Sequence, residues 1–272
     1  MEDLARKKKV VTVIQARMGS TRLPNKVFLP LAGEPLLYRM YERVKASHLT
    51  GTIIIAIPQE LDDDPIESFC KEKNINVFRG DTYDLLDRHY KAGLKYNAEA
   101  IVKIPSDCPL IDPNVISKTI GFYLEHSENF DYVSNLHPQS YPDGNDVEIM
   151  SMEAVKIAWK KAYRDFEREH TTPYFWENPD KFRLGNVKWE SGFDYSMTYR
   201  WTIDYYEDYL FIKEVYDELY HQNPLFGIDD ILNLLSLKPE LIKINEKYVG
   251  VNWYRNHLNE LKTISAEQTK QV

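Results

Sequence analysis

Residues 10–26 read VVTVIQARMGSTRLPNK, a short apolar run followed by a polar turn that carries three cations. The run from Val10 to Ile14 is continuously apolar, which is typical of a buried parallel strand. Successive backbone N–H groups around Gly19 would form a concave anion site, since glycine has no Cβ to hold a phosphate away. Arg17 and Lys26 add a forked donor and a point charge. The segment lacks the Gly-Lys-Ser/Thr ending of a Walker loop but resembles a grip for a nucleoside triphosphate. A solvated basic turn after an edge strand is the alternative.

Apolar segments and amphipathic helical patterns alternate along the chain after this turn. Strands are expected at residues 52–57, 75–78, 100–104 and 131–134, and helices at 35–46, 62–73, 83–96 and 113–126. This repeated strand–helix order predicts a three-layer α/β/α domain with a mostly parallel, mixed sheet.

The second half of the chain is less regular. Strands are expected at 147–150, 182–189 and 199–204, helices at 153–164 and 206–220, a short helix from residue 168, and a helical segment at 227–261. The sequence contains no linker long enough to separate two domains. We therefore expect a tail at 1–9, one α/β domain at 10–225, and a C-terminal helical extension at 226–272 that ends in a disordered tail.

The composition narrows the class of protein. A net charge of -8 repels nucleic acid and anionic lipid, so a polynucleotide partner is not expected. The two cysteines, Cys70 and Cys108, give neither a disulfide framework nor a zinc pattern, which fits a reducing cytoplasm. No apolar run approaches the length of a membrane span, so a cytoplasmic protein without membrane contact is expected.

Two aspartates that are far apart in the sequence lie at the ends of predicted strands. Asp107 follows the strand at 100–104, and Asp204 ends the strand at 199–204. In open α/β sheets, ligands bind beyond the carboxyl ends of the strands. Two carboxylates there could jointly hold one Mg²⁺ ion, which takes oxygen ligands and keeps several waters. An N-cap or turn role is the alternative for each aspartate.

The motif QARMGSTRLPNK at 15–26, followed by LAGEPLL at 31–37, resembles the opening of the cytidylyltransferase family. The similarity is to the branch of spore coat polysaccharide biosynthesis protein F, whose relatives make CMP-Kdo and CMP-sialic acid. Residues 104–111, IPSDCPLI, are similar to the family's Gly-Asp-x-Pro-Leu-Ile segment, and residues 200–208, RWTIDYYED, to its Arg-Trp-Thr-x-Asp-x-x-Glu-Asp segment. The chain departs from the family at Pro105-Ser106 and at Tyr205-Tyr206, which leaves the shape of the nucleotide pocket open.

The resemblance implies a nucleotide-diphospho-sugar transferase-like fold and roles for three groups of residues. Catalytic roles fall to Arg17, Lys26, Asp107 and Asp204, the two aspartates being the Mg²⁺ ligands. The residues expected to bind the nucleotide are Ala16, Met18, Gly19, Ser20, Thr21, Arg22, Asp87, Arg88 and Ser106. The residues expected to bind the acceptor substrate are Asp146, Glu148, Arg168, His170 and Arg200. The alternatives are an exposed helical ion pair for Asp87 and Arg88, outward positions on an edge strand for Asp146 and Glu148, and a capping role for His170.

The activity that the resemblance implies is transfer of CMP from CTP to an acidic, nonulosonic acid-like sugar or related acceptor, with release of pyrophosphate. Such a reaction belongs to surface polysaccharide or glycan biosynthesis. The expected partners are CTP, the acceptor and a second copy of the chain, with residues 195–201 as the dimer contact. One alternative is a glycosyltransferase of the same fold, which usually holds a metal through a compact Asp-x-Asp that residues 143–146 lack. The other is a non-catalytic nucleotide-binding subunit.

Overall fold

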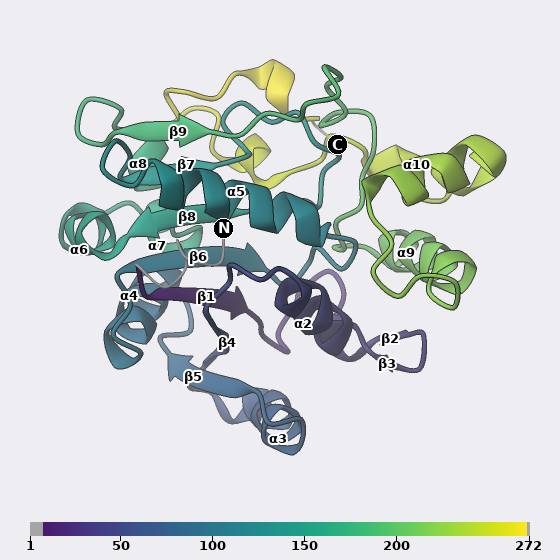
Figure 1. Cartoon of the computed structure of the whole chain (residues 1–272), viewed down its shortest axis with the longest axis horizontal. Coiled ribbons are helices and arrows are strands. Elements are labelled where there is room, and N and C mark those ends of the chain that lie inside the picture. Colours follow the sequence, from purple (N-terminus) through teal and green to yellow (C-terminus); the bar gives the residue numbers. More distant parts are fainter. Residues whose placement is uncertain (1–7, 271–272) are drawn as a thin grey trace.

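A seven-stranded mixed sheet forms the centre of the computed structural model, which describes residues 8–270 (Figure 1). Its strand order is β5-β4-β1-β6-β8-β7-β9. The strands are β1 (Val10–Gln15), β4 (Thr52–Pro58), β5 (Asn76–Gly80), β6 (Ala100–Pro105), β7 (Tyr132–Ser134), β8 (Glu148–Ser151) and β9 (Leu184–Asn186). All neighbours pair in parallel except β8, which is antiparallel to both β6 and β7. The mostly parallel, mixed sheet expected from the sequence is confirmed.

Helices cover both faces of the sheet and give the expected three layers. One face packs against α2 (Leu36–Ala46), α3 (Asp64–Glu72), α5 (Pro113–Glu125), α9 (Tyr206–Leu219) and α10 (Ile228–Leu237). The other packs against α4 (Leu85–Lys95), α6 (Met152–Lys161), α7 (Asp165–Glu169) and α8 (Pro173–Trp176). Alternate residues of β1 enter the two cores, Ile14 on the first face and Val13 on the second, as the two-residue repeat of a strand requires. β1 is therefore buried on both faces, which explains its continuous apolar sequence.

The strand expected at residues 199–204 does not form. Only an isolated bridge between Arg200 and Asp143 is present, and the segment runs between two loops instead of joining the sheet. Trp201 N–H donates to the carbonyl of Asp143 at 2.8 Å, and Ile203 N–H donates to the carbonyl of Asp107 at 2.8 Å. Gly144 permits this approach, because its φ is +107° and a Cβ there would lie 2.7 Å from the carbonyl carbon of Trp201. The apolar run was thus correctly expected to be buried, but loop carbonyls satisfy its backbone.

The C-terminal segment is less helical than its sequence pattern predicts. After α10 the chain continues in short 3-10 turns, η3 (Pro239–Ile244), η4 (Glu246–Tyr248), η5 (Trp253–Asn256) and η6 (Ala266–Gln268). It packs back on the α/β domain, where Leu241 joins the core on one face of the sheet and Leu261 the core on the other. The strand expected at 182–189 is similarly reduced, to three residues in β9. Of the two expected tails, residues 1–7 and 271–272 lie outside the described residues.

Two small elements precede α2. A short 3-10 helix, η1 (Lys26–Phe28), follows the turn after β1, and a two-residue hairpin joins β2 (Pro30–Leu31) to β3 (Glu34–Pro35). Another 3-10 turn, η2 (Leu61–Asp63), leads into α3. No helix within residues 8–270 is long and apolar enough to cross a membrane.

Candidate active site

The loop after β1 is folded back on itself at the carboxyl end of the sheet. The carbonyl of Met18 accepts the N–H groups of Ser20 at 2.9 Å and Asn25 at 3.2 Å, and Met18 N–H donates to the Asp63 carboxylate at 2.7 Å. Asn25 lies in the left-handed region with φ of 59° and starts η1. A Cβ on Gly19 would meet no atom within 4 Å, so the outer face of this loop is open to a ligand.

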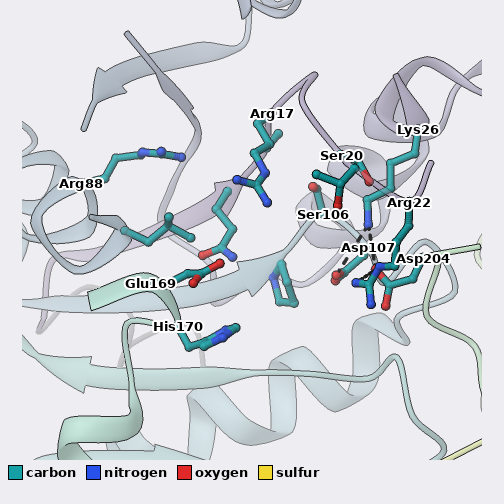
Figure 2. A pocket seen from close by; sticks show the side chains of 15 residues that line it. Arg17, Ser20, Arg22, Lys26, Arg88, Ser106, Asp107, Glu169, His170 and Asp204 are labelled. Atoms are coloured by element: carbon teal, nitrogen blue, oxygen red, sulfur yellow. Dashed lines mark hydrogen bonds and ion pairs between the residues drawn. The ribbon is translucent and has the colours of Figure 1, made fainter. Parts of the chain in front are cut away.

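A cavity of about 220 Å³ lies between this loop, the end of β6 and the start of α4 (Figure 2). It sits beyond the carboxyl ends of β1 and β6, where open α/β sheets bind their ligands. Its lining brings together many residues expected from the sequence, namely Ala16, Arg17, Ser20, Thr21, Arg22, Lys26, Arg88, Ser106, Asp107, His170 and Asp204. Four cations in one small cavity of an acidic protein favour a polyanionic ligand.

The ammonium group of Lys26 lies between the carboxylates of Asp107 and Asp204 at one end of the cavity. Its ammonium nitrogen lies 3.3 Å from Oδ1 of Asp204 and 3.9 Å from Oδ2 of Asp107, and it donates to the carbonyl of Ile203 at 2.6 Å. Figure 2 shows both carboxylates turned toward this nitrogen. Thr202 Oγ1 and Ile203 N–H both donate to the carbonyl of Asp107, which ties the two loops together. The local structure therefore holds both side chains around a single positive charge.

Asp204 is ionised in this setting. Burial alone would raise its carboxyl pKa, but the nearby charges of Lys26, Arg22 and Arg200 bring the pKa below its usual value. The Arg22 guanidinium lies 2.7 Å away and that of Arg200 3.1 Å away. A bound anion would draw on the same cations, so ligand binding and the charge state of Asp204 are linked.

The donor set suits a hard divalent cation. The Lys26 ammonium shows that oxygens of Asp107 and Asp204 can converge on one positive centre, and the Asp107 side chain is 32% exposed, which leaves room for water ligands. Mg²⁺ is commonly held by one or two carboxylates plus substrate phosphates. Within residues 8–270 no group of three or more His, Cys, Asp or Glu side chains forms a complete metal cage, so any ion here would depend on such external ligands.

Arg17 and Arg88 lie at the other end of the cavity. Arg17 is exposed and extends from the loop after β1, while Arg88 comes from α4 (Figure 2). The Arg88 guanidinium is 1% exposed and donates to the carbonyls of Asp81 at 2.9 Å and Thr82 at 3.0 Å. Burial lowers its pKa to about 10, which still leaves it charged at neutral pH. These two arginines extend the cationic lining away from Lys26.

Five residues with an expected binding role do not line this cavity, and four of them have other partners in this structure. Asp87 accepts from the Trp159 indole at 2.8 Å, Glu148 pairs with Lys103 at 2.6 Å, Arg168 pairs with Asp84, and Arg200 pairs with Asp208 at 2.9 Å. The fifth, Asp146, lines a second cavity that borders the first at His170. Met18 and Gly19 belong to the loop after β1 without lining the first cavity. The proposed direct contacts of these seven residues stay predictions.

Sequence reasoning missed Gln15, Leu85, Pro105 and Glu169, which also line the cavity. Gln15 ends β1 directly opposite Pro105 on β6, and its side-chain oxygen is buried without a hydrogen-bond partner within the described residues. A buried amide acceptor normally has a partner, so this one points to a ligand donor. The signal was present in the sequence, since Gln15 is the polar residue that ends the apolar strand.

The sheet and its helices define an α/β protein of the nucleotide-diphospho-sugar transferase fold. A structure of CMP:2-keto-3-deoxy-manno-octonic acid synthetase complexed with CTP shares this fold, with a TM-score of 0.58 and 15% identity over 79% of this chain and 99% of that one. A cytidylyltransferase from Leptospira borgpetersenii serovar Hardjo-bovis superimposes with a TM-score of 0.81 and 33% identity, covering 86% of this chain and 97% of that one.

The family follows from the sequence comparisons. Residues 11–233 match the model of the cytidylyltransferase family. The spore coat polysaccharide biosynthesis protein SpsF of Bacillus subtilis (strain 168) is 30% identical over 236 residues, which are 85% of this chain and 95% of that protein. The chain belongs to the cytidylyltransferase family, and its resemblance to the spore coat branch is confirmed.

Proposed function

We propose that the protein transfers CMP from CTP to a hydroxyl group of an acidic, nonulosonic acid-like sugar or a related acceptor, and releases pyrophosphate. The observation that carries this proposal is the position of Lys26 between Asp107 and Asp204, beside a loop that presents Arg17 and Arg22. A triphosphate needs several positive charges, and a phosphoryl-type transfer needs positioning and charge neutralisation more than covalent catalysis.

The roles of the cations follow from where they lie. Lys26 and Arg22, next to Asp204, would neutralise the β- and γ-phosphates and the departing pyrophosphate, together with the backbone N–H groups of Gly19 and Thr21. Arg17 and Arg88 would face the other end of the nucleotide, where Ser106 and Gln15 also lie. The acceptor hydroxyl would approach from the side of His170, which borders both cavities.

Asp107 and Asp204 are the proposed holders of one Mg²⁺ ion. When bound, the ion would neutralise charge at the α-phosphate and lower the pKa of the acceptor hydroxyl. The lining of the cavity offers no obvious separate general base. His170, the only histidine in the part of the lining that the structure describes, has a pKa of about 3 because of its burial and the nearby Lys103 charge.

Relatives support the nucleotide and the biological setting. The Bacillus subtilis relative is a spore coat polysaccharide biosynthesis protein, and the synthetase of the same fold was solved with CTP. We propose CTP as the nucleotide and polysaccharide biosynthesis as the setting for this chain as well. A cytoplasmic location and a homodimer belong to the proposal as well. Met197, within the expected contact at 195–201, and Phe193, just before it, are 40% and 59% exposed and are candidates for the dimer surface.

The test is a nucleotide and acceptor screen. The full chain would be incubated with Mg²⁺, each of CTP, UTP, ATP and GTP, and a panel of acid sugars, with pyrophosphate release as the readout. CTP is expected to support release with at least one acid sugar, and omission of Mg²⁺ or of the acceptor is expected to stop it. Release that depends on another nucleotide, or CTP binding without release for any acceptor, would contradict the proposal.

A further inference from the structure

The second cavity lies next to the neighbouring strands β6 and β8, between the loop at 136–146 and the C-terminal segment. It holds about 80 Å³ and shares His170 with the first cavity. Its wall includes Asp143, Asp146 and Glu148 on one side and Trp253 on the other. Trp253 lies in η5, beyond the residues 11–233 that match the family model, so this wall is not part of the matched region.

The charges of this cavity are not balanced. Its one lysine, Lys103, lies 2.6 Å from Glu148, and both side chains are almost buried, so the two charges cancel. The carboxylate of Asp146 makes no hydrogen bond or ion pair with the residues that the structure describes. The nearest cation to Asp143 is Arg200 at 3.7 Å, which already pairs more closely with Asp208 at 2.9 Å. Two carboxylates therefore face the cavity without a cation of their own.

The histidines of the cavity do not supply the missing charge. Burial lowers the pKa of His137 to about 4 and that of His170 to about 3, so both rings are neutral at neutral pH. Burial and the neighbouring carboxylates raise the pKa of Asp143 to about 7 and that of Asp146 well above its usual value. A cation beside these carboxyl groups would lower both pKa values and favour the charged forms, whereas a carboxylate would find no free counter-ion among the described lining residues.

Aromatic rings surround the same space. His170 stacks on Trp253 with ring centroids 3.8 Å apart, and His137 packs on Trp176 at 4.5 Å. Trp176 is 4% exposed, and its indole N–H has no hydrogen-bond partner within residues 8–270, so it is free to donate to a hydroxyl oxygen of a ligand, although not to an ammonium group. Tyr254 lies 6.1 Å from Trp176, centroid to centroid. Electron-rich ring faces next to carboxylates are the usual surroundings of a bound ammonium group.

We propose that this second cavity binds the protonated amine of an amino-bearing sugar acceptor, held by Asp143 and Asp146 and enclosed by Trp176 and Trp253. The proposal rests on the proposed function, since it takes the cavity next to the nucleotide as the acceptor site. It deepens that function by naming the acceptor as an amino sugar acid rather than an acid sugar that bears hydroxyl groups alone. The carboxylate of such an acceptor would lie toward the arginines of the first cavity, and its amine in the second.

The test uses three two-carbon alcohols whose second group is an ammonium, a hydroxyl or a carboxylate, respectively: ethanolamine, ethylene glycol and glycolate. Saturation-transfer NMR on the full chain measures the weak binding of each at neutral pH, with and without CTP and Mg²⁺. The transfer to ethanolamine is expected to exceed that to the other two, and its affinity to be on the order of tenfold higher. Asp146→Asn and Trp253→Ala are each expected to remove this advantage, whereas Asp229→Asn, an exposed carboxylate on α10, is expected to keep it.

Each outcome decides the proposal. Equal transfer to all three alcohols, stronger transfer to glycolate, or an ethanolamine signal that survives Asp146→Asn in a variant folded by circular dichroism would overturn it. Because ethanolamine binding is read without any turnover, it can succeed even when no acceptor yields pyrophosphate from CTP. Failure of the amine site and failure of the proposed cytidylyl transfer are thus told apart.

Discussion

The ammonium nitrogen of Lys26 lies 3.3 Å from Oδ1 of Asp204, a residue 178 positions further along the chain. This contact sets a cation of the loop after β1 against a carboxylate at the opposite wall of the cavity. Because the same ammonium is within 3.9 Å of Asp107, a triphosphate bound here would meet one preorganised positive charge between two acidic side chains.

Replacement of this lysine should therefore impair the reaction. Lys26→Ala is expected to lower kcat for pyrophosphate release by on the order of 10² or more, the usual loss on removing one preorganised charge donor. The matched control is Lys118→Ala, which removes a surface lysine paired with Glu190 and should leave kcat unchanged. Turnover of Lys26→Ala within twofold of the parent protein would show that this charge is not used in the transition state.

Asp107→Asn tests the proposed Mg²⁺ ligand. The backbone carbonyl of Asp107, which accepts from Ile203 N–H and Thr202 Oγ1, is untouched by this change, so the loops should remain in place. We expect an unchanged far-ultraviolet circular dichroism spectrum and loss of Mg²⁺-dependent pyrophosphate release. A Mg²⁺ titration of the reaction rate is the measurement. Near-normal release from the variant would remove Asp107 from the proposed metal site.

Gln15→Ala tests the first residue of the motif at 15–26, for which the sequence predicted no role. Since the side-chain oxygen of Gln15 is buried and lacks a hydrogen-bond partner in the described structure, its removal should cost little stability. If the amide binds the nucleotide, CTP affinity measured by calorimetry should fall by roughly three- to tenfold, the effect of one hydrogen bond. Gln59→Ala, at an exposed position, is the control. An unchanged CTP affinity would assign Gln15 to the acceptor or to water.

The sequence alone predicted that residues of the candidate site would lie together, because they stand at points where a pattern changes. Lys26 follows a Gly-Ser turn after the apolar strand β1, and Asp107 follows β6, the strand directly beside β1 in the sheet. Parallel strands bring such positions to one edge, so their proximity could be inferred without coordinates. Asp204 was also located, although the reason differs: its segment lies against loop carbonyls instead of forming a strand.

Partners distant in the sequence could not be inferred in the same way. Arg168 pairs with Asp84, 84 positions earlier, and Glu148 with Lys103, 45 positions earlier. Periodicity shows which face of an element a charge occupies but not which opposite charge reaches it, so both residues could be assigned to a ligand equally well. The C-terminal segment presented the same problem, because apolar spacing in 227–261 suits a helix while Pro239 and Gly250 break it into short turns.

Arg200→Met tests whether Arg200 is needed for stability. The residue is 2% exposed, pairs with the fully buried Asp208 at 2.9 Å, and donates to the carbonyl of Val251 at 2.6 Å. Removal of one partner of a buried pair leaves an uncompensated charge and should cost about 3–5 kcal/mol in urea denaturation. The double change with Asp208→Asn should recover part of this loss. Lys213→Met, which breaks an exposed pair, should cost at most about 1 kcal/mol.

His89 makes folding stability depend on pH. Its ring is fully buried and its Nδ1 lies 2.7 Å from the carbonyl of Leu85, and burial lowers the pKa from 6.5 to about 3. Between these two pH values the unfolded chain binds a proton that the folded chain does not. Stability from this residue is therefore fully present above about pH 6.5 and falls as the pH drops toward 3.

Urea denaturation at pH 7, 6 and 5 measures this dependence. His89→Gln, which cannot titrate, should lose less stability between pH 7 and pH 5 than the parent protein, whatever its stability at pH 7. His221→Gln, which replaces an exposed histidine, should retain the slope of the parent protein. Parallel slopes for the parent and His89→Gln would mean that the partly buried histidines, His137 and His170, or groups elsewhere carry the whole effect.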